Sequence, residues 1–303
     1  MQEAPYDVLH FSGRDVLDLL HRLSTNAVAH LPEGGTEETV LTTEKGRIVD
    51  LLLLGHFPDG ILVLCSNGRG GAVLDWVEKF TITDDVKGSD LTHDIAVATL
   101  VGPQAISTLS EACQLELQDG ECVLDEGAGV WCVSHAGPRG SRVVLGGNRD
   151  ALDAIMQRVD VPMVGPEAAE LLRIRLGMPA APGELNGDYT PYDVGLADLI
   201  SFTKGCYVGQ EVIARLDAYG KASRGLIGLE MSSEVCEMAE TTIHKGSAQI
   251  GRLTSCVREG DRAFGLGVVR VEGVQTGDEL EVRSGDSALA GRVVMLAAGG
   301  RVA

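Results

Sequence analysis

The chain has 303 residues, 44% hydrophobic and 23% charged, which is an ordinary composition for a globular protein of two or three domains. Its formal net charge is −19, and the acidic residues are spread along the chain. This charge excludes a chain-wide basic surface, so we expect no direct, stable nucleic-acid binding. Lys221 with Arg224 is the best candidate for a local basic patch.

The same sequence predicts no contact with a membrane. No apolar run approaches 18 residues, so no membrane-spanning helix is expected. The first 13 residues are acidic and lack the basic and apolar segments of a leader peptide. A cytoplasmic location is therefore predicted.

The first 200 residues alternate between helices and groups of adjacent strands. Apolar residues with helical spacing predict a first helix from Val16 to Leu23, and Ser12 with Asp15 has the spacing of an acidic capping box before it. Further helices are predicted at 69–80, after Gly102-Pro103, after Asn148, and at 166–176. Strands are predicted at 39–44, 48–54, 61–65, 95–101, 130–135 and 142–145. This pattern favours an α+β fold with antiparallel sheets over a doubly wound parallel sheet.

Beyond about residue 226 the character of the chain changes. Short strands separated by Gly-Asp and Glu-Gly turns are predicted at 226–231, 248–256, 263–271, 279–283 and 288–296. Regular turn signals without helical periodicity predict a small antiparallel β-barrel. The expected domains are therefore an α+β region of two interwoven subdomains, 1–218, and a C-terminal barrel, 219–303.

Two partial signals predict structure rather than chemistry. The glycine-rich turn at Gly68 and Gly70 lacks the third glycine of a dinucleotide-binding loop, because Val73 stands there, so it predicts a plain turn. No pair of histidines has metal-ligand spacing, and packed or surface histidines are expected.

The cysteines differ in their surroundings. There are seven, an odd number without C-x-x-C spacing, which predicts free thiols and no disulfide framework: Cys65, Cys113, Cys122, Cys132, Cys206, Cys236 and Cys256. Cys65 and Cys132 lie in apolar strand-like runs, where cysteine packs as a small hydrophobe. Cys206 lies instead among glycine and lysine.

The segment from Lys204 to Glu211, KGCYVGQE, is the densest group of reactive and backbone-special residues. Lys204 and the start of a predicted helix at 210–216 would both favour the Cys206 thiolate. Gly205 and Gly209 permit a positive φ or a close approach of a ligand to the backbone. A functional thiol and a structural cysteine in a tight glycine turn are both compatible with this pattern.

KGCYVGQE closely resembles the signature of the YgfZ-type folate-binding proteins, which serve the maintenance of iron–sulfur clusters. The resemblance extends to Phe11–Asp15, Lys45–Arg47, 172–179 and Thr190-Pro191. The parent superfamily includes the glycine-cleavage T-protein, a tetrahydrofolate-dependent aminomethyltransferase. The resemblance implies two α+β subdomains with ferredoxin-like features around a central folate-sized opening, and a C-terminal barrel. It also places Tyr6 and Asn26 among the folate contacts.

Three positions depart from the T-protein pattern. Leu51 follows Asp50 where the T-protein has a second aspartate that supports its chemistry, and leucine cannot move a proton. Arg175 replaces the glutamate that accepts hydrogen bonds from the pterin, and arginine only donates. Ala169 stands at a tryptophan position of the superfamily. Conventional turnover as an aminomethyltransferase is therefore not expected.

The resemblance implies an accessory protein for the assembly or repair of iron–sulfur clusters. Cys206 would bridge a [2Fe-2S] cluster or carry a transient persulfide, together with an A-type scaffold protein or a glutaredoxin, with tetrahydrofolate bound in the central opening. Lys204 and Arg215 would tune or present the thiol within a loop that includes Tyr207. Gln210 and Glu211 would fix that loop through its backbone. The alternatives are a folate-dependent aminomethyltransferase or demethylase, and a structural module with a buried Cys206.

Overall fold

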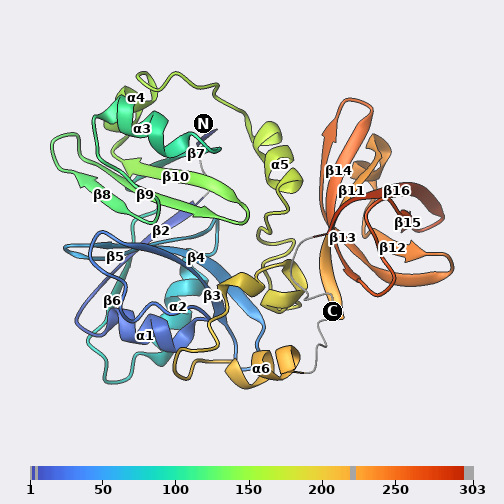
Figure 1. Cartoon of the computed structure of the whole chain (residues 1–303), viewed down its shortest axis with the longest axis horizontal. Helices are drawn as coiled ribbons and strands as arrows, with labels where there is room; N and C mark the ends of the chain where they lie inside the picture. The colour runs from blue at the N-terminus through green and yellow to red at the C-terminus, as the bar shows by residue number, and fades with distance from the viewer. Residues whose placement is uncertain (1, 4–5, 219–222, 297–303) are drawn as a thin grey trace. The chain divides into compact units, whose positions relative to one another are not determined.

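The computed structural model describes residues 2–3, 6–218 and 223–296 (Figure 1). The chain forms two compact units, each built from separate segments. Unit 1 comprises Met1–Thr42, Val49–Val164 and Ser201–Val208, and unit 2 comprises Thr43–Ile48, Gly165–Ile200 and Gly209–Ala303. The expected domain boundary at 218/219 adjoins residues 219–222, which lie outside the described part of the chain. Lys221, one of the two residues of the predicted basic patch, is among them. None of the described helices is long and apolar enough to cross a membrane.

Unit 1 contains two five-stranded sheets, as the alternation of helices with groups of strands predicts. The first has the order β3-β4-β5-β2-β6, with bounds Thr36–Thr42, Ile48–Phe57, Gly60–Ser66, Tyr6–Ser12 and Lys87–Asp90. The second has the order β1-β7-β10-β9-β8, with bounds Gln2–Glu3, Ala96–Val101, Gly140–Gly147, Val130–Gly137 and Cys122–Asp125. The predicted α+β class with antiparallel sheets is confirmed.

Helices cover the outer faces of these sheets (Figure 1). Helices α1 (Val16–Leu23) and α2 (Gly70–Phe80) share a buried core with the first sheet. Helices α3 (Ala105–Cys113) and α4 (Arg149–Met156) do the same on the second sheet. A third apolar cluster joins the inner faces of the two sheets, with Leu53 and Leu64 from one and Trp131 from the other. Unit 1 is therefore a four-layer arrangement of helices, sheet, sheet and helices.

Two local predictions at helix starts have different outcomes. The Gly68–Gly70 turn is a structural turn, because both carboxylate oxygens of Asp7 accept its backbone N–H groups, at 3.0 Å from Gly68 and 2.7 Å from Gly70. The capping box before α1 is wrong. Ser12 is the last residue of β2, and the carboxylate of Asp15 accepts the N–H of Asp85 at 2.7 Å instead of capping the helix.

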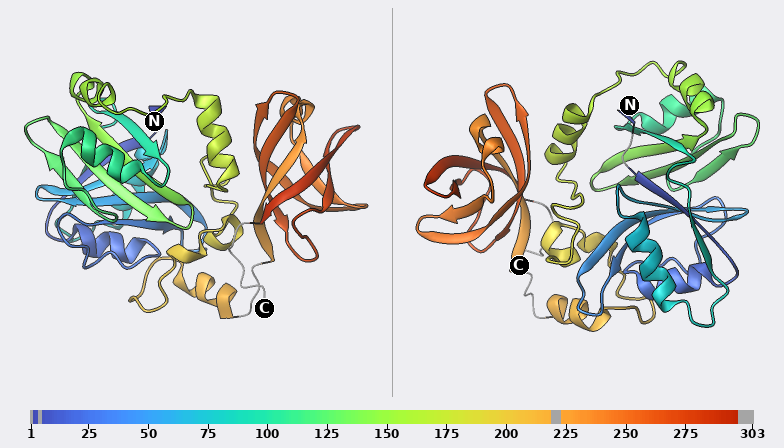
Figure 2. Two further views of the ribbon diagram at one scale, coloured as in Figure 1. Left: turned by 45° about the horizontal axis from the view of Figure 1, so that its top comes forward. Right: turned by 180° about the vertical axis from the view of Figure 1, so that it is seen from behind.

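Unit 2 contains a closed barrel with the strand order β11-β14-β13-β12-β15-β16 (Figure 2). The bounds, in that order, are Arg224–Ser232, Arg262–Arg270, Ala248–Glu259, Thr242–Lys245, Glu279–Ser284 and Ser287–Leu296. The sequence predicted five of these strands and missed β12, whose four residues carry too little alternation to stand out. Helix α5 (Pro166–Arg175) packs against β13 and β14, and α6 (Gln210–Ala218) follows the Cys206 loop in the chain.

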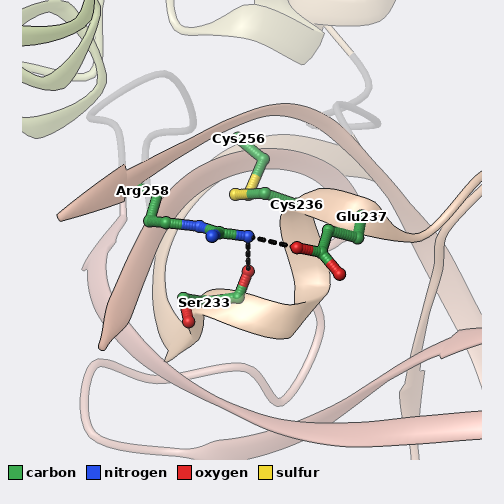
Figure 3. The surroundings of a disulfide bond; sticks show 5 residues. All are labelled: Ser233, Cys236, Glu237, Cys256 and Arg258. Carbon is green, nitrogen blue, oxygen red and sulfur yellow. Dashed lines mark hydrogen bonds and ion pairs between the residues drawn. A yellow bond between two sulfur atoms is a disulfide. The ribbon is translucent and has the colours of Figure 1, made fainter. Parts of the chain in front are cut away.

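The barrel carries a disulfide that the sequence did not predict. Cys236, in the short helix η3 (Ser233–Glu237), is bonded to Cys256 in β13 (Figure 3). Their Cα atoms are 5.7 Å apart although 20 residues separate them in the chain. Beside the bridge, Arg258 pairs with Glu237 at 2.7 Å. The expectation of no disulfide is therefore wrong for Cys236 and Cys256, because β13 lies alongside η3, a proximity that no local spacing reveals.

Candidate functional site

The segment 201–208 belongs to unit 1, where its ends are hydrogen-bonded to the last turn of α1, to the residues just after α1 and to β3. The N–H of Ser201 donates to the carbonyl of Thr25 at 3.0 Å, and the N–H of Val208 donates to the carbonyl of Arg22 at 2.9 Å. The hydroxyl of Thr42 donates to the carbonyl of Val208 at 2.7 Å. These bonds fix the two ends of the loop that carries Cys206.

Lys204 holds the same loop from its middle. Its ammonium nitrogen donates to the carbonyl oxygens of His21, Ser24 and Asn26, at 2.5, 2.6 and 2.7 Å. Burial lowers the pKa of Lys204 to about 7. Three carbonyl acceptors nevertheless require the charged form, because a neutral amine has only two N–H groups to donate. A cation at the C-terminal end of α1 also complements the helix dipole. We infer that Lys204 positions the loop.

The aromatic neighbour of Cys206 completes the anchoring. The Tyr207 side chain is 7% exposed, and its ring centroid lies 4.9 Å from the Lys204 nitrogen, within the range of a cation–π contact. Burial raises the pKa of Tyr207 to about 12, so the phenol stays neutral near pH 7. Gly205 and Cys206 are exposed between these anchors. The loop therefore displays the thiol between two anchored residues, Lys204 and Tyr207.

The two glycines of the motif differ. Gly209 has a φ of +86°, and a Cβ there would lie 2.5 Å from the carbonyl oxygen of Thr43, so glycine is required. Gly205 has no positive φ, and a Cβ there would meet no atom within 4 Å among the described residues. The positive φ is confirmed for Gly209 and absent at Gly205, where a close approach of a ligand to the backbone stays a prediction.

Cys206 stands apart from the other free thiols. Cys65, Cys122 and Cys132 are buried, and burial raises the pKa of each thiol, to about 12 for the last two. Cys113 is half-buried, and burial raises its pKa as well. Of the five free cysteines in the described residues, only Cys206 is exposed. The alternative of a buried, structural Cys206 is wrong.

Cys206 is a single potential metal ligand. Among the described residues, no group of three or more histidine, cysteine or carboxylate side chains is placed to hold a metal ion. A cluster attached to the Cys206 thiolate would need further ligands from another molecule.

Asn26, a predicted folate contact, is already engaged with the chain. Its amide nitrogen donates to a carboxylate oxygen of Glu37 and to the carbonyl of Glu38, both at 2.9 Å. Its amide oxygen accepts the N–H of Ala27 at 2.8 Å. With both amide atoms engaged, Asn26 shapes the turn after α1 whether or not it also meets a ligand.

Tyr6, the other predicted folate contact, borders a buried charged cluster that was not predicted from the sequence. Arg142 hydrogen-bonds Tyr6 and is ion-paired with Glu38, which is 1% exposed. His135 and Arg139 reach the same carboxylate at 3.0 and 3.1 Å. Burial favours the neutral acid, but the surrounding cations outweigh it and hold the pKa of Glu38 well below its usual range. A single arginine in the apolar strand run RVVL was the signal that could have revealed this cluster.

Asp50, the acid that this chain keeps, and Arg175, one of the departing residues, both have partners within the fold. Asp50 is fully buried, and its carboxylate accepts both the hydroxyl and the N–H of Ser66, at 2.7 and 2.9 Å. Burial raises the pKa of Asp50. In unit 2, Arg175 pairs with Glu259 at 2.6 Å and lies over the Phe264 ring at 4.5 Å. Asp50 and Arg175 are therefore both engaged with other residues of the chain.

The last motif residues lie in unit 2. Gln210 and Glu211 form the first turn of α6, which begins where the sequence predicts, and Arg215 is exposed on the same helix. The expected hydrogen bonds from Gln210 and Glu211 to the loop, and the role of Arg215 beside Cys206, stay predictions.

Comparison with known proteins agrees with this architecture. Residues 5–123 match the GCVT N-terminal domain. A chloroplastic protein from Arabidopsis thaliana, named as a transferase, is 27% identical over 96% of this chain and 71% of its own length. The aminomethyltransferase of Bacillus licheniformis is 27% identical over 92% of this chain and 83% of its own length.

A solved structure extends the likeness to the whole fold. The glycine cleavage system aminomethyltransferase T from Bartonella henselae superimposes with a TM-score of 0.80 at 20% identity, covering 97% of this chain and 84% of that one. The chain therefore has the fold of that aminomethyltransferase, and its residues 5–123 are similar to the GCVT N-terminal domain.

Proposed function

We propose that this protein binds a reduced folate, the ligand that the resemblance to the T-protein implies. Similarity to aminomethyltransferases over more than nine-tenths of the chain carries the proposal. Tyr6, half-buried beside the Glu38–Arg142 pair, supplies the aromatic ring for stacking on the pterin.

The residues present offer the acceptor that a pterin needs. Arg175 cannot take that role, because guanidinium groups only donate hydrogen bonds. Glu37 can: it is half-buried on β3, and one of its carboxylate oxygens accepts from Asn26. Burial raises the pKa of Glu37, yet both its charged and its neutral form keep an acceptor oxygen.

Anaerobic calorimetry with tetrahydrofolate tests this proposal. We expect binding of one folate per chain and a loss of about tenfold in affinity for Tyr6→Leu, the size of a lost stacking contact. Tyr6→Phe is the matched control, because it keeps the ring and removes only the hydrogen bond to Arg142. Absence of tetrahydrofolate binding by the wild-type protein would remove the proposal.

One-carbon transfer by an aminomethyltransferase is the reaction that the names of the relatives favour most directly, and a folate-dependent demethylase is the related alternative. Aminomethyl transfer in the T-protein manner needs the acid that Leu51 replaces, and Asp50 is bound to Ser66. We therefore expect no turnover with tetrahydrofolate and an aminomethyl donor or methylamine. Turnover by the wild-type protein would establish the transferase and show that another group replaces the missing acid.

The display of Cys206 favours a second candidate function, in the assembly or repair of iron–sulfur clusters. Its thiol is exposed on a loop anchored by Lys204, Tyr207 and Val208. In this proposal Cys206 supplies one thiolate, and an A-type scaffold protein or a glutaredoxin supplies the others for a shared [2Fe-2S] cargo. Arg215 presents the thiol to that partner. A transient persulfide on Cys206 would also be accessible to a partner protein, because the sulfur is exposed.

Anaerobic cluster reconstitution with a scaffold protein, followed by absorption, tests this second function. We expect Cys206→Ala to abolish the cluster shared with the scaffold, and Cys113→Ala, which removes a half-buried thiol, to leave it unchanged. Equal cluster formation by the Cys206 variant and the wild type would rule out the role of this thiol, while leaving folate binding to be judged by calorimetry.

A further inference from the structure

Unit 2 contains a pocket of about 590 Å³ between the segment before η1 (Pro191–Val194) and the barrel. This volume lies within the range of small-molecule sites, about 300–1,000 Å³. Its lining includes Asp188, Tyr189, Arg224, Val268, Arg252 and Arg270. All of these residues belong to unit 2, so the pocket is complete within one compact unit.

The charge of the pocket is opposite to that of the chain. Arg224, Arg252 and Arg270 line it together with one acid, Asp188, and Asp193 pairs with Arg224 from outside this lining, which leaves one positive charge in excess. The whole chain carries a net charge of −19. A second pocket, of about 170 Å³, shares Arg224 and is also lined by Lys45, Arg47 and one acid, Asp193. Basic side chains are thus concentrated around Arg224, one of the two residues that the sequence marks as a local basic patch.

Buried contacts hold two of these guanidinium groups in place. Tyr189 is 2% exposed, and its ring centroid lies 5.4 Å from the Arg224 guanidinium and 5.3 Å from that of Arg252. Arg224 is also paired at 2.8 Å with Asp193, whose carboxylate accepts from the N–H and the hydroxyl of Thr190. Because their partners fix them, these cations are preorganised.

Hydrogen-bond donors remain unused in the pocket. Arg252 donates through Nε to the Tyr189 hydroxyl at 2.7 Å and through Nη2 to Asp188 at 2.5 Å. Its Nη1 group has no partner among the described residues. Arg270 is exposed at the pocket and makes no hydrogen bond or ion pair with any described side chain. The Tyr189 hydroxyl accepts from Arg252, so its own proton can be donated as well.

We propose that this pocket binds a small organic polyanion with at least two carboxylate or phosphate groups. One anionic group meets Arg252 and the Tyr189 hydroxyl, and another meets Arg270. Guanidinium forks match the planar geometry of carboxylates and phosphates. Asp188 opposes the anion, and its pairing with Arg252 limits that repulsion.

Calorimetry of the full chain at low ionic strength, with pyrophosphate and citrate as probes, tests the site. We expect one anion per chain. Arg270→Gln should weaken binding about tenfold, because it removes a charged donor that has no other partner in the described residues. Asp188→Asn should strengthen binding by several-fold through the loss of repulsion. Tighter binding of pyrophosphate would assign the phosphate class, and tighter binding of citrate the carboxylate class.

Arg262→Gln is the matched control, since Arg262 lies on the same strand as Arg270, pairs with Glu230 at 2.6 Å and does not line the pocket. It should leave both affinities unchanged. Opposite effects of the Arg270 and Asp188 variants cannot arise from a general loss of folding. Failure of both probes to bind the wild type, or equal weakening by the Arg270 and Arg262 variants, would overturn the proposal.

Discussion

Glu38 in unit 1 and Glu184 in unit 2 are both excluded from solvent, with 1% and 0% exposure, yet their partners differ in kind. Glu38 faces cations: Arg142, Arg139 and His135. Glu184 accepts from Arg173 at 3.2 Å, but its other partners are neutral donors. These are the hydroxyls of Thr254 and Ser255 and the N–H of Ala180.

The two sites differ in how the partners of the glutamate are left when its carboxylate is removed. Around Glu38, the charge of buried Arg142 would be left without its counter-ion, and a buried unpaired charge is costly. Around Glu184, Arg173 keeps its second partner, Glu170, at 2.5 Å, and hydroxyl groups can rotate toward other acceptors. We expect unit 1 to depend more strongly on its buried glutamate than unit 2 does.

The largest expected effect is that of Glu38→Gln. It should destabilise unit 1 by about 3–5 kcal/mol, the cost of breaking a buried ion pair from one side. Both tryptophans, Trp76 and Trp131, lie in unit 1, so urea unfolding followed by tryptophan fluorescence reports on that unit. Glu37→Gln, at the half-buried neighbour, is the control. A decrease of less than about 1 kcal/mol in the free energy of unfolding for Glu38→Gln would contradict the stronger dependence of unit 1 on its buried glutamate.

Acid should act through the same carboxylate. The pKa of Glu38 in the folded chain lies below its unfolded value, so its stabilising contribution is present above the unfolded value, about 4.5, and is lost as the pH falls below it. Unit 1 should therefore lose stability as the pH falls from about 5 toward 3. Tryptophan fluorescence against pH measures this, and an identical pH profile for Glu38→Gln would contradict it.

Glu184→Gln should have a smaller effect, about 1–3 kcal/mol, because an amide keeps one acceptor oxygen for the hydroxyl groups. Hydrogen exchange of the β13 amides measures it, since Thr254 and Ser255 lie in that strand. A cost equal to that of Glu38→Gln would show that the neutral donors of unit 2 confer no tolerance.

Lys204→Met should act more locally, at about 1–2 kcal/mol, because it removes the bonds to three carbonyl oxygens while keeping the apolar stem. We expect faster amide hydrogen exchange at residues 201–208 and little change in the exchange rates of the β-sheets. Unchanged exchange in that segment would argue against an anchoring role for Lys204.

Cys206→Ser should change the stability of unit 1 by less than about 0.5 kcal/mol, because the thiol is exposed. Comparing Cys206→Ser with Lys204→Met distinguishes the exposed thiol from Lys204, which anchors the loop that carries it. A destabilisation above about 1 kcal/mol, measured by urea unfolding, would show that the thiol has a packing role.

The sequence by itself determined the features that depend on neighbours within a few residues. The apolar stripe from Val16 to Leu23, the Asn148 cap and most barrel strands follow from local periodicity and turn chemistry, and the structure confirms them. The KGCYVGQE loop stood out for the same reason, because its reactive and flexible residue types are contiguous.

Only the tertiary structure decided which distant groups meet. Lys204 binds carbonyl groups about 180 residues away, and Arg142 reaches Glu38 across 104 positions. Cys236 and Cys256 form a bridge without a recognisable spacing, and the pocket arginines come from separate barrel strands. These pairings follow from the packing of sheets and loops, because burial selects partners by proximity in space, and no periodicity in the sequence records that proximity.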